Sequence, residues 1–107
     1  MANSTFAIAM YKPKAGKEEQ LLAIIEKHTP LLKTEGLITD FQPLLLRSEN
    51  GTYLELFDWK SVEAKDRAHS NDSVMKLWEE MMEVADMKEL SSLAEAGQLF
   101  PNFERIK

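Results

Sequence analysis

The sequence predicts a single α+β domain, because extended and helical segments follow one another in the order strand, helix, strand, strand, helix, strand. Two observations carry this order: apolar residues recur at helical spacing in two separate stretches, and Glu49-Asn50-Gly51 lies between two extended runs. Asn-Gly in that position is the strongest short signal for a β-hairpin. This order is that of the ferredoxin-like βαββαβ fold, whose four-stranded antiparallel sheet has strands one and three at its centre. A chain of 107 residues has room for one hydrophobic core, so one domain over residues 1–107 is expected.

The predicted strands are apolar or aromatic runs that end at turn residues. They are Thr5 to Tyr11, Ile38 to Ser48, Thr52 to Lys60 and Gln98 to Ile106. Pro43 and Pro101 fall in the second and fourth strands, which this fold places at the edges of the sheet. Proline cannot donate to a ladder and is tolerated at edges, so both prolines agree with the predicted order.

The first predicted helix runs from Lys17 to about Glu35. Pro30 lies inside it, lacks an amide donor and is expected to kink or interrupt the last turns, before Gly36 provides the stop. The apolar positions recur at spacings of three and four and therefore share one face; they are Leu21, Leu22, Ile24, Ile25, His28 and Leu32.

The second helical region is predicted to be divided. Ser61 is a good N-cap for a helix over Val62 to Ser70, and Ser70-Asn71-Asp72 offers a second cap. Lys88 to Ala96 is predicted to form one more short helix, which Gly97 closes before the last strand. The apolar stripe of the longer helix consists of Val74, Leu77, Trp78, Met81 and Ala85.

Composition excludes several classes of function. The net charge of −5 arises from 13 basic and 18 acidic residues scattered along the chain, so no basic face for nucleic acid is predicted. The absence of cysteine excludes disulfides, thiolate nucleophiles and thiolate metal ligands. No apolar run approaches the roughly 20 residues that cross a bilayer, so no membrane partner is expected. Met1 to Thr5 lacks the features of an export signal, and a cytoplasmic location is therefore predicted.

Helices on one face of a four-stranded sheet leave its other face uncovered. The third strand carries Tyr53, Phe57 and Trp59 on one side and Leu54 and Leu56 on the other, so both of its sides are partly apolar. A second copy packed face to face would bury this surface and close a barrel. The sequence thus predicts a homodimer in the form of a dimeric α/β barrel.

Three side chains are candidates for acid-base chemistry. His28 lies on the apolar stripe of the first helix, His69 ends the helical segment after the third strand, and Glu55 shares a strand face with Trp59. If the three converge, burial and mutual charge would tune them for proton transfer. Alternatively, each histidine is a packed residue and Glu55 faces solvent. A metal site formed by the same three residues is a further alternative, but none is predicted, because the three lack the tight spacing of metal motifs.

Aromatic and thioether side chains are predicted to line an apolar pocket for a small molecule. Trp59 and Phe57 come from the third strand, and Trp78 and Met81 come from the helical stripe. Such a stripe is also typical of an ordinary core, in which methionine fills irregular gaps. The functional hypothesis depends on one expectation, that the rings of Trp59 and His69 face a shared hollow between sheet and helices.

The segment LELFDWKSVEAKDRAHSNDSVMKLW, together with the order of elements, resembles the antibiotic-biosynthesis-monooxygenase superfamily of dimeric α+β barrel proteins. This superfamily includes cofactor-independent oxygenases that act on quinol- or anthrone-like aromatics, haem-degrading enzymes and proteins without an assigned activity. In the haem-degrading branch a tryptophan and a histidine occur at the spacing of Trp59 and His69. That branch also uses an asparagine on the first strand, where Phe6 to Met10 has none.

The resemblance implies a monooxygenase that needs no cofactor and acts on a small aromatic substrate. His69, helped by Glu55 or His28, would remove a proton, and the resulting anion would react with oxygen while Trp59 and Trp78 stack on the substrate. It also implies an alternative, a dimeric barrel that binds haem or another small apolar molecule without turnover. A third alternative is a structural or stress-associated dimer whose pocket is filled by its own side chains.

Overall fold

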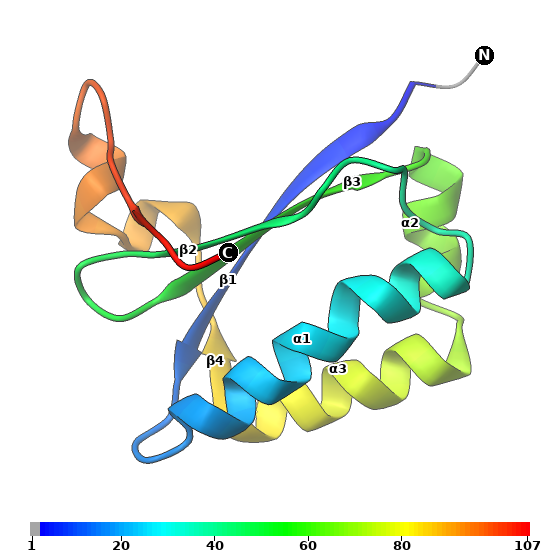
Figure 1. Ribbon diagram of the computed structural model, residues 1–107, viewed down its shortest axis with the longest axis horizontal. Helices are drawn as coiled ribbons and strands as arrows, with labels where there is room; N and C mark the ends of the chain where they lie inside the picture. Colours follow the sequence, from blue (N-terminus) through cyan, green and yellow to red (C-terminus); the bar gives the residue numbers. More distant parts are fainter. Residues whose placement is uncertain (1–2) are drawn as a thin grey trace.

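The computed structural model describes residues 3–107, in which one antiparallel sheet of five strands carries α1 and α3 side by side against one face (Figure 1). The strands lie in the order β4-β1-β3-β2-β5. Their bounds are β1 Thr5–Pro13, β2 Leu44–Arg47, β3 Tyr53–Trp59, β4 Ala85–Met87 and β5 Glu104–Arg105. The helices are α1 Glu18–Thr34, α2 Val62–Ala68 and α3 Asp72–Val84, followed after β4 by the 3₁₀ turns η1 Leu90–Ser92 and η2 Ala94–Gly97. The α+β class is confirmed, and the arrangement is compatible with a ferredoxin-like fold.

The last strand differs from the prediction. The edge strand beside β1 is β4, which follows α3 directly because Ala85 already has extended backbone. The predicted strand from Gln98 to Ile106 is reduced to β5, which pairs with β2 at the opposite edge. Local sequence carries little signal for β4, because it has only three residues and they include an aspartate, which is rare in strands. The sheet therefore has five strands where four were predicted.

The prolines differ from the prediction, and Pro101 lies before β5 rather than within a strand. Pro43 immediately precedes β2, which is shorter than the predicted strand from Ile38 to Ser48 and is no longer an edge, because β5 pairs with it. Ile38 itself makes only an isolated bridge with Trp59. Pro30 lies inside α1 but does not interrupt it, since the helix continues to Thr34.

The predicted division of the second helical region is confirmed by its caps. The Ser61 hydroxyl accepts a hydrogen bond from the Ala64 amide at 3.0 Å, and the Asn71 side chain accepts one from the Val74 amide at 3.0 Å. Each cap satisfies an amide that has no partner within its helix, and α2 and α3 therefore form as separate helices. The single short helix predicted over residues 88–96 is replaced by two 3₁₀ turns, η1 and η2, and Gly97 belongs to the second of them.

Two apolar clusters fill the space between the sheet and the helices. The first consists of Tyr11, Leu21, Ile25, Leu45, Tyr53, Met81, Val84 and Ala85, and the second of Leu32, Leu37, Ile38, Phe57, Trp59, Ala64, Ala68 and Val74. Along α1, His28 lies between Ile25 of the first cluster and Leu32 of the second. Along β3, Glu55 lies between Tyr53 and Phe57 in the same way. The fold thus places two ionisable side chains at the junction of its two apolar clusters.

The hairpin between β2 and β3 forms where Asn-Gly predicted it. The Gly51 amide donates to the Ser48 carbonyl at 3.0 Å, and the Ser48 amide donates to the Thr52 carbonyl at 2.8 Å. Gly51 has φ +88°, a left-handed conformation that costs a residue with a Cβ atom much more than it costs glycine.

We expect Gly51→Ala to lower the free energy of unfolding by about 1 to 2 kcal/mol, because alanine resists this backbone conformation. A Cβ atom there would also lie 3.4 Å from Lys12 Nζ, an ordinary contact that adds no clash. Gly97→Ala is the matched control, because Gly97 has no left-handed φ and its Cβ would meet nothing within 4 Å. Urea denaturation of the two variants measures the difference, and equal stabilities would contradict the assignment.

Candidate functional site

The candidate site is built on His28 of α1 and Glu55 of β3, which are 1% and 2% exposed. The helical periodicity that makes α1 amphipathic turns His28 toward the sheet. The alternation of β3 turns Glu55 to the same side as Tyr53, Phe57 and Trp59. The prediction that Glu55 shares a buried strand face with Trp59 is therefore confirmed, and a solvent-facing Glu55 is excluded.

Four side chains form a continuous hydrogen-bonded chain at this point. His28 Nδ1 lies 2.7 Å from Glu55 Oε1, and the Tyr11 hydroxyl donates to the same oxygen at 2.8 Å. On the other side of the imidazole, the Trp78 indole N–H lies 2.9 Å from His28 Nε2. The chain connects β1, β3, α1 and α3, so the sheet and the helical layer each contribute two members.

The hydrogen bonds fix the tautomer of His28. An indole N–H is only a donor, so Nε2 must accept and cannot carry a proton. The proton of a neutral imidazole then lies on Nδ1, which donates to Glu55 Oε1. Glu55 Oε1 therefore receives two donors, the imidazole and the Tyr11 hydroxyl, which is the environment that favours a carboxylate in a buried place.

The Tyr11 hydroxyl acts as a hydrogen-bond donor to Glu55 Oε1. Burial of its ring, followed by the charge of Glu55 and the hydrogen bond to it, raises the pKa of the Tyr11 hydroxyl well above its ordinary value of 10.0. Each of these effects disfavours a phenolate next to a carboxylate in a place of low dielectric. The hydroxyl consequently stays protonated and keeps Glu55 Oε1 occupied at neutral pH.

The second oxygen of Glu55 is not fully sealed from solvent. No hydrogen bond to Oε2 is found within residues 3–107. If this oxygen were also sealed from solvent, it would be a buried polar atom without a partner, but within these residues only Glu95 Oε1 is such an atom. Glu55 Oε2 must therefore reach accessible volume. The accessible volume that Glu55 lines is a pocket of about 430 Å³ between α1 and β2.

The pocket has apolar walls and a charged rim. Its walls include Ile25, Pro30, Pro43, Leu44 and Leu45. At the rim, Lys107 Nζ donates to Glu26 Oε1 at 2.7 Å, and this contact lowers the pKa of the Glu26 carboxyl. Arg105 also lines the pocket. Glu26 is exposed and paired with a cation, whereas Glu55 is buried and leaves one oxygen for a ligand, so Glu55 is the carboxylate of the pocket suited to act as a base.

The expected hollow shared by Trp59 and His69 is not present, and this prediction is wrong. His69 is exposed, and its ring packs edge-on against Trp78 with ring centroids 5.0 Å apart. Trp59 is buried in the second apolar cluster against Phe57. Neither residue lines the pocket between α1 and β2. The α2 helix and its C-cap place His69 at the outer side of Trp78, a position that the residue spacing alone does not reveal.

The other predicted pocket residues lie around the polar chain rather than in the pocket wall. Trp78 is half-buried and holds His28, and Phe57 contacts the His28 ring edge-on at 5.5 Å between centroids. Met81 is fully buried in the first apolar cluster, as expected of an ordinary core residue. The chain thus brings together His28, Glu55 and Trp78 of the predicted set.

Sequence reasoning missed Tyr11 as a site residue. Register pairs Tyr11 with Tyr53 and Ala9 with Glu55, so Tyr11 lies diagonally across from Glu55 on the same sheet face. Shared parity on two predicted strands was available as a signal, but the register that brings the two side chains together was not. The pocket wall supplied by the segment around Pro43 and by the last residues of the chain also carried no recognisable motif.

The described residues do not fit a haem or a metal ion in this pocket. Both ring nitrogens of His28 are engaged, so the imidazole has no lone pair available for iron. His69 lies outside the pocket, and in residues 3–107 no group of three or more His, Asp or Glu side chains is arranged to hold a metal ion. We therefore derive no step through such a group.

We expect Tyr11→Phe to make the stability of the protein less sensitive to alkaline pH. Because the folded-state pKa of Tyr11 is raised, the unfolded chain releases this proton above about pH 10 while the folded chain retains it, and stability falls as pH increases. The variant lacks that contribution, although it also loses a hydrogen bond to a charged group that contributes about 1.5 to 3 kcal/mol at neutral pH. Urea unfolding at pH 8 and pH 11 gives the comparison. If the wild type and the variant lose the same amount of stability between pH 8 and pH 11, the prediction for Tyr11 is wrong.

Among residues 3–107 no helix combines the length and the apolar character that crossing a bilayer requires. Comparison of the chain with protein-family models, with curated proteins and with solved structures finds no match in any of the three.

Proposed function

We propose that the protein binds a small aromatic or apolar molecule in the pocket between α1 and β2 and removes a proton from it with Glu55. The observation that carries this proposal is that the two oxygens of the buried Glu55 carboxylate have different surroundings. Tyr11 and His28 both donate to Oε1, no hydrogen bond to Oε2 is found within residues 3–107, and Glu55 lines the pocket. A base needs a lone pair aimed at its substrate and a fixed orientation, and this arrangement supplies both.

The pocket supports binding of a molecule of modest size. Its volume of about 430 Å³ lies within the range of roughly 300 to 1,000 Å³ for small-molecule sites. The apolar walls favour a ring or hydrocarbon, and Glu55 is the polar group at the buried end. A phenol, quinol or anthrone places an acidic hydrogen on an apolar ring system, which is the combination these walls and this carboxylate accommodate.

The proposed reaction is that of a cofactor-independent monooxygenase. Proton transfer to Glu55 Oε2 leaves an electron-rich anion, which gives its electrons to dioxygen. For an anthrone-like substrate, one oxygen atom replaces the two hydrogens of a ring CH₂ group, and the other oxygen leaves as water. The low-dielectric surroundings of Glu55 strengthen the interactions of the charges that form. His28 and Trp78 hold the carboxylate in position and do not touch the substrate.

We expect Glu55→Gln to reduce oxygen consumption with a quinol and anthrone panel by about 100-fold or more, the usual contribution of a general base. Glutamine keeps an oxygen that can accept from Tyr11 and His28 but cannot take the proton. His69→Ala is the matched control and should retain activity within about twofold, because the ring is exposed and outside the pocket. Circular dichroism verifies that each variant is folded. Full activity of Glu55→Gln, or loss of activity in His69→Ala alone, would refute Glu55 as the base.

A binding protein without turnover is the alternative, and the completeness of the polar chain favours it. Each member from Tyr11 to Trp78 has its partner, so the network also suffices as a buried structural support. In that case a panel member would bind in the pocket, with no oxygen consumed by the wild-type protein.

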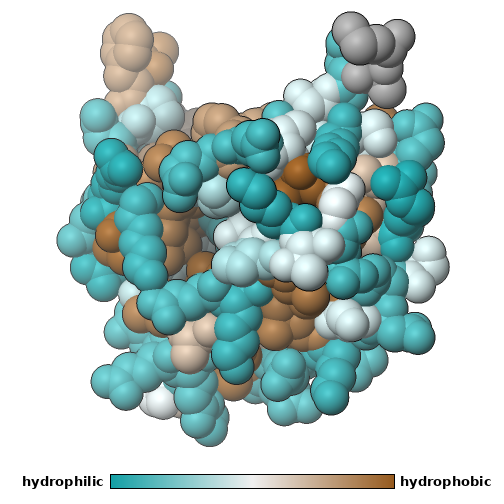
Figure 2. Space-filling model, turned by 45° about the vertical axis from the view of Figure 1, so that its right-hand side comes forward, coloured by the Kyte–Doolittle hydropathy of each residue, from teal (hydrophilic) through white to brown (hydrophobic). Residues whose placement is uncertain are grey.

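We further propose that two copies associate through the sheet face that the helices leave open. On that face, cross-strand pairs form two apolar rows. The row Ile8-Leu56-Leu44 is partly open, whereas Leu54 in the middle of the row Met10-Leu54-Leu46 is already buried within the single chain. Phe6 is 50% exposed and Ile8 43% exposed, and a patch of this kind on a sheet face is typical of an interface. Figure 2 shows from one side how hydrophobic side chains come to the surface in patches between hydrophilic ones.

We expect the wild-type protein to sediment as a dimer at micromolar concentration and Ile8→Lys to sediment as a monomer, because a charge in the centre of the open face opposes its burial. Val62→Lys serves as the control, since Val62 is 52% exposed but belongs to α2. Sedimentation velocity of the three proteins decides the matter. A wild-type monomer, or dissociation by both substitutions, would contradict this interface.

A further inference from the structure

We propose that a pocket beside the β2–β3 hairpin binds a phosphate group, either free phosphate or the phosphate of a small monoester. This pocket has a volume of about 200 Å³ and is formed by the end of β1, the hairpin and the chain that follows β4. Its lining residues are Lys12, Asn50, Thr52, Lys88 and Ser92. None of them is acidic, although the whole chain has a net charge of −5, and none lines the pocket between α1 and β2.

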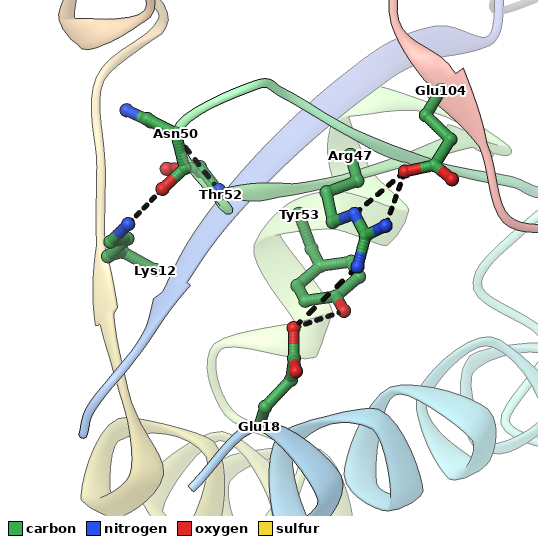
Figure 3. A network of polar contacts seen from close by, with 7 residues as sticks. All are labelled: Lys12, Glu18, Arg47, Asn50, Thr52, Tyr53 and Glu104. Carbon is green, nitrogen blue, oxygen red and sulfur yellow. Dashed lines mark hydrogen bonds and ion pairs between the residues drawn. The ribbon is translucent and has the colours of Figure 1, made fainter. Parts of the chain in front are cut away.

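Two lysines supply the positive charge of this pocket. In residues 3–107 neither Lys12 nor Lys88 forms an ion pair. Asp86 is the cross-strand partner of Lys12 on β4, but the Lys12 ammonium donates to the carbonyl oxygen of Asn50, as Figure 3 shows. This hydrogen bond uses one N–H of the ammonium and leaves two. Lys12 is therefore held at the hairpin, and its charge is not paired with a carboxylate.

The side-chain amide of Asn50 is oriented so that its nitrogen is free to donate. Its Oδ1 accepts hydrogen bonds from the Ser48 hydroxyl and from the Thr52 amide, the latter at 3.0 Å. Two donors on one atom assign that atom as the oxygen and fix the orientation of the amide. Nδ2 then carries two N–H donors, for which no acceptor is found within residues 3–107. Figure 3 shows this nitrogen and the Lys12 ammonium on the same side of the hairpin.

The Thr52 hydroxyl is a further donor that the chain leaves without a partner. Thr52 is 1% exposed, and no hydrogen bond of its Oγ1 is found in the part of the chain that the structure describes. This oxygen is nevertheless not fully sealed from solvent, because among these residues Glu95 Oε1 alone is both sealed and unpartnered. Since Thr52 lines the pocket, an acceptor bound there would satisfy a buried hydroxyl that has no other partner.

The arrangement of donors favours a phosphate group over other anions. The donors of Lys12, Asn50, Thr52 and Lys88 come from three separate segments and therefore approach a ligand from several directions. A phosphate presents tetrahedral oxygen acceptors and a charge of about −1.5 to −2 at neutral pH. A carboxylate presents only two oxygens in one plane and a single charge. Lysine ammonium groups bind phosphate as point charges, so they need no paired geometry.

The size of the pocket limits what the phosphate can carry. A volume of about 200 Å³ corresponds to about seven waters at roughly 30 Å³ each, so the site has room for a phosphate and a few further atoms. The Ser92 hydroxyl already donates to the Glu89 carbonyl at 2.6 Å and adds no donor. Two cations are too few to follow a nucleic-acid backbone, whose binding needs a row of them. A small phosphate monoester or phosphate itself is therefore the ligand that charge and volume select.

Titration with sodium phosphate at about pH 7.5, with sodium chloride added to keep the ionic strength constant, tests the proposal by ¹⁵N-resolved NMR. We expect saturable shifts that are largest for the Asn50 side-chain amide and for the Thr52 backbone amide, which donates to it. Lys88→Gln should weaken binding about fivefold or more, since it removes one of the two charges. Lys76→Gln, which changes an exposed lysine of α3, is the matched control and should bind like the wild type.

A second variant, Thr52→Val, separates recognition from folding. Valine keeps the size of threonine and lacks the hydroxyl, and no partner within residues 3–107 loses a hydrogen bond. The urea midpoint of unfolding should therefore not fall, while the affinity for phosphate should fall about threefold or more. Unchanged affinity in this variant would contradict the role of Thr52 and the proposed site.

Methyl phosphate, acetate and chloride serve as comparison ligands. Saturation by methyl phosphate identifies a monoester as the source of the phosphate group, and saturation by inorganic phosphate alone identifies the free ion; both support the site. Tighter binding of acetate than of either phosphate would overturn the assignment to phosphate. The same shifts with sodium chloride alone, or equal affinity of Lys88→Gln and the wild type, would overturn the site itself.

Discussion

The structure depends on one buried carboxylate and on the donors that make its burial tolerable. Glu55 lies at the junction of two apolar clusters, where an unpaired charge would be strongly destabilising. Tyr11 and His28 remove that cost by donating to Oε1, and Trp78 fixes the imidazole that does so. Because the four side chains come from two strands and two helices, the network also sets how the helices lie on the sheet. The same contacts therefore position the carboxylate of the candidate site and the helices of the core.

The pocket follows from how the sheet ends on the β2 side. Pro43 lies directly before β2, and the irregular chain at residues 42 and 43 lines the pocket together with α1. The last residues of the chain pair with β2, where the Ile106 amide donates to the Leu45 carbonyl at 2.8 Å, and so complete the wall. Lys107 then reaches α1 through Glu26. The pocket is therefore formed by α1, β2 and the end of the chain, and β3 contributes Glu55 to it.

Two pockets of the protein differ in chemistry and draw on different parts of the chain. The first has apolar walls around one carboxylate, which accepts hydrogen bonds from Tyr11 and His28. The second, beside the hairpin, is lined by polar and charged residues throughout. The first lies between α1 and β2, whereas the second lies where the hairpin meets the end of β1.

The sequence by itself determined the order of elements from β1 to α3, the hairpin at Asn50-Gly51, the caps at Ser61 and Asn71, and the position of His28 on the apolar face of α1, because caps, turns and periodicity are local properties. Only the tertiary structure decided which of these residues meet. Strand register brought Tyr11 to Glu55, helix packing brought Trp78 to His28, and the turn after α2 left His69 outside. It also decided that β4 would be the edge strand beside β1 and that the end of the chain would cross to β2. Register and packing depend on contacts between residues far apart in the chain, and a single sequence carries no local signal for them.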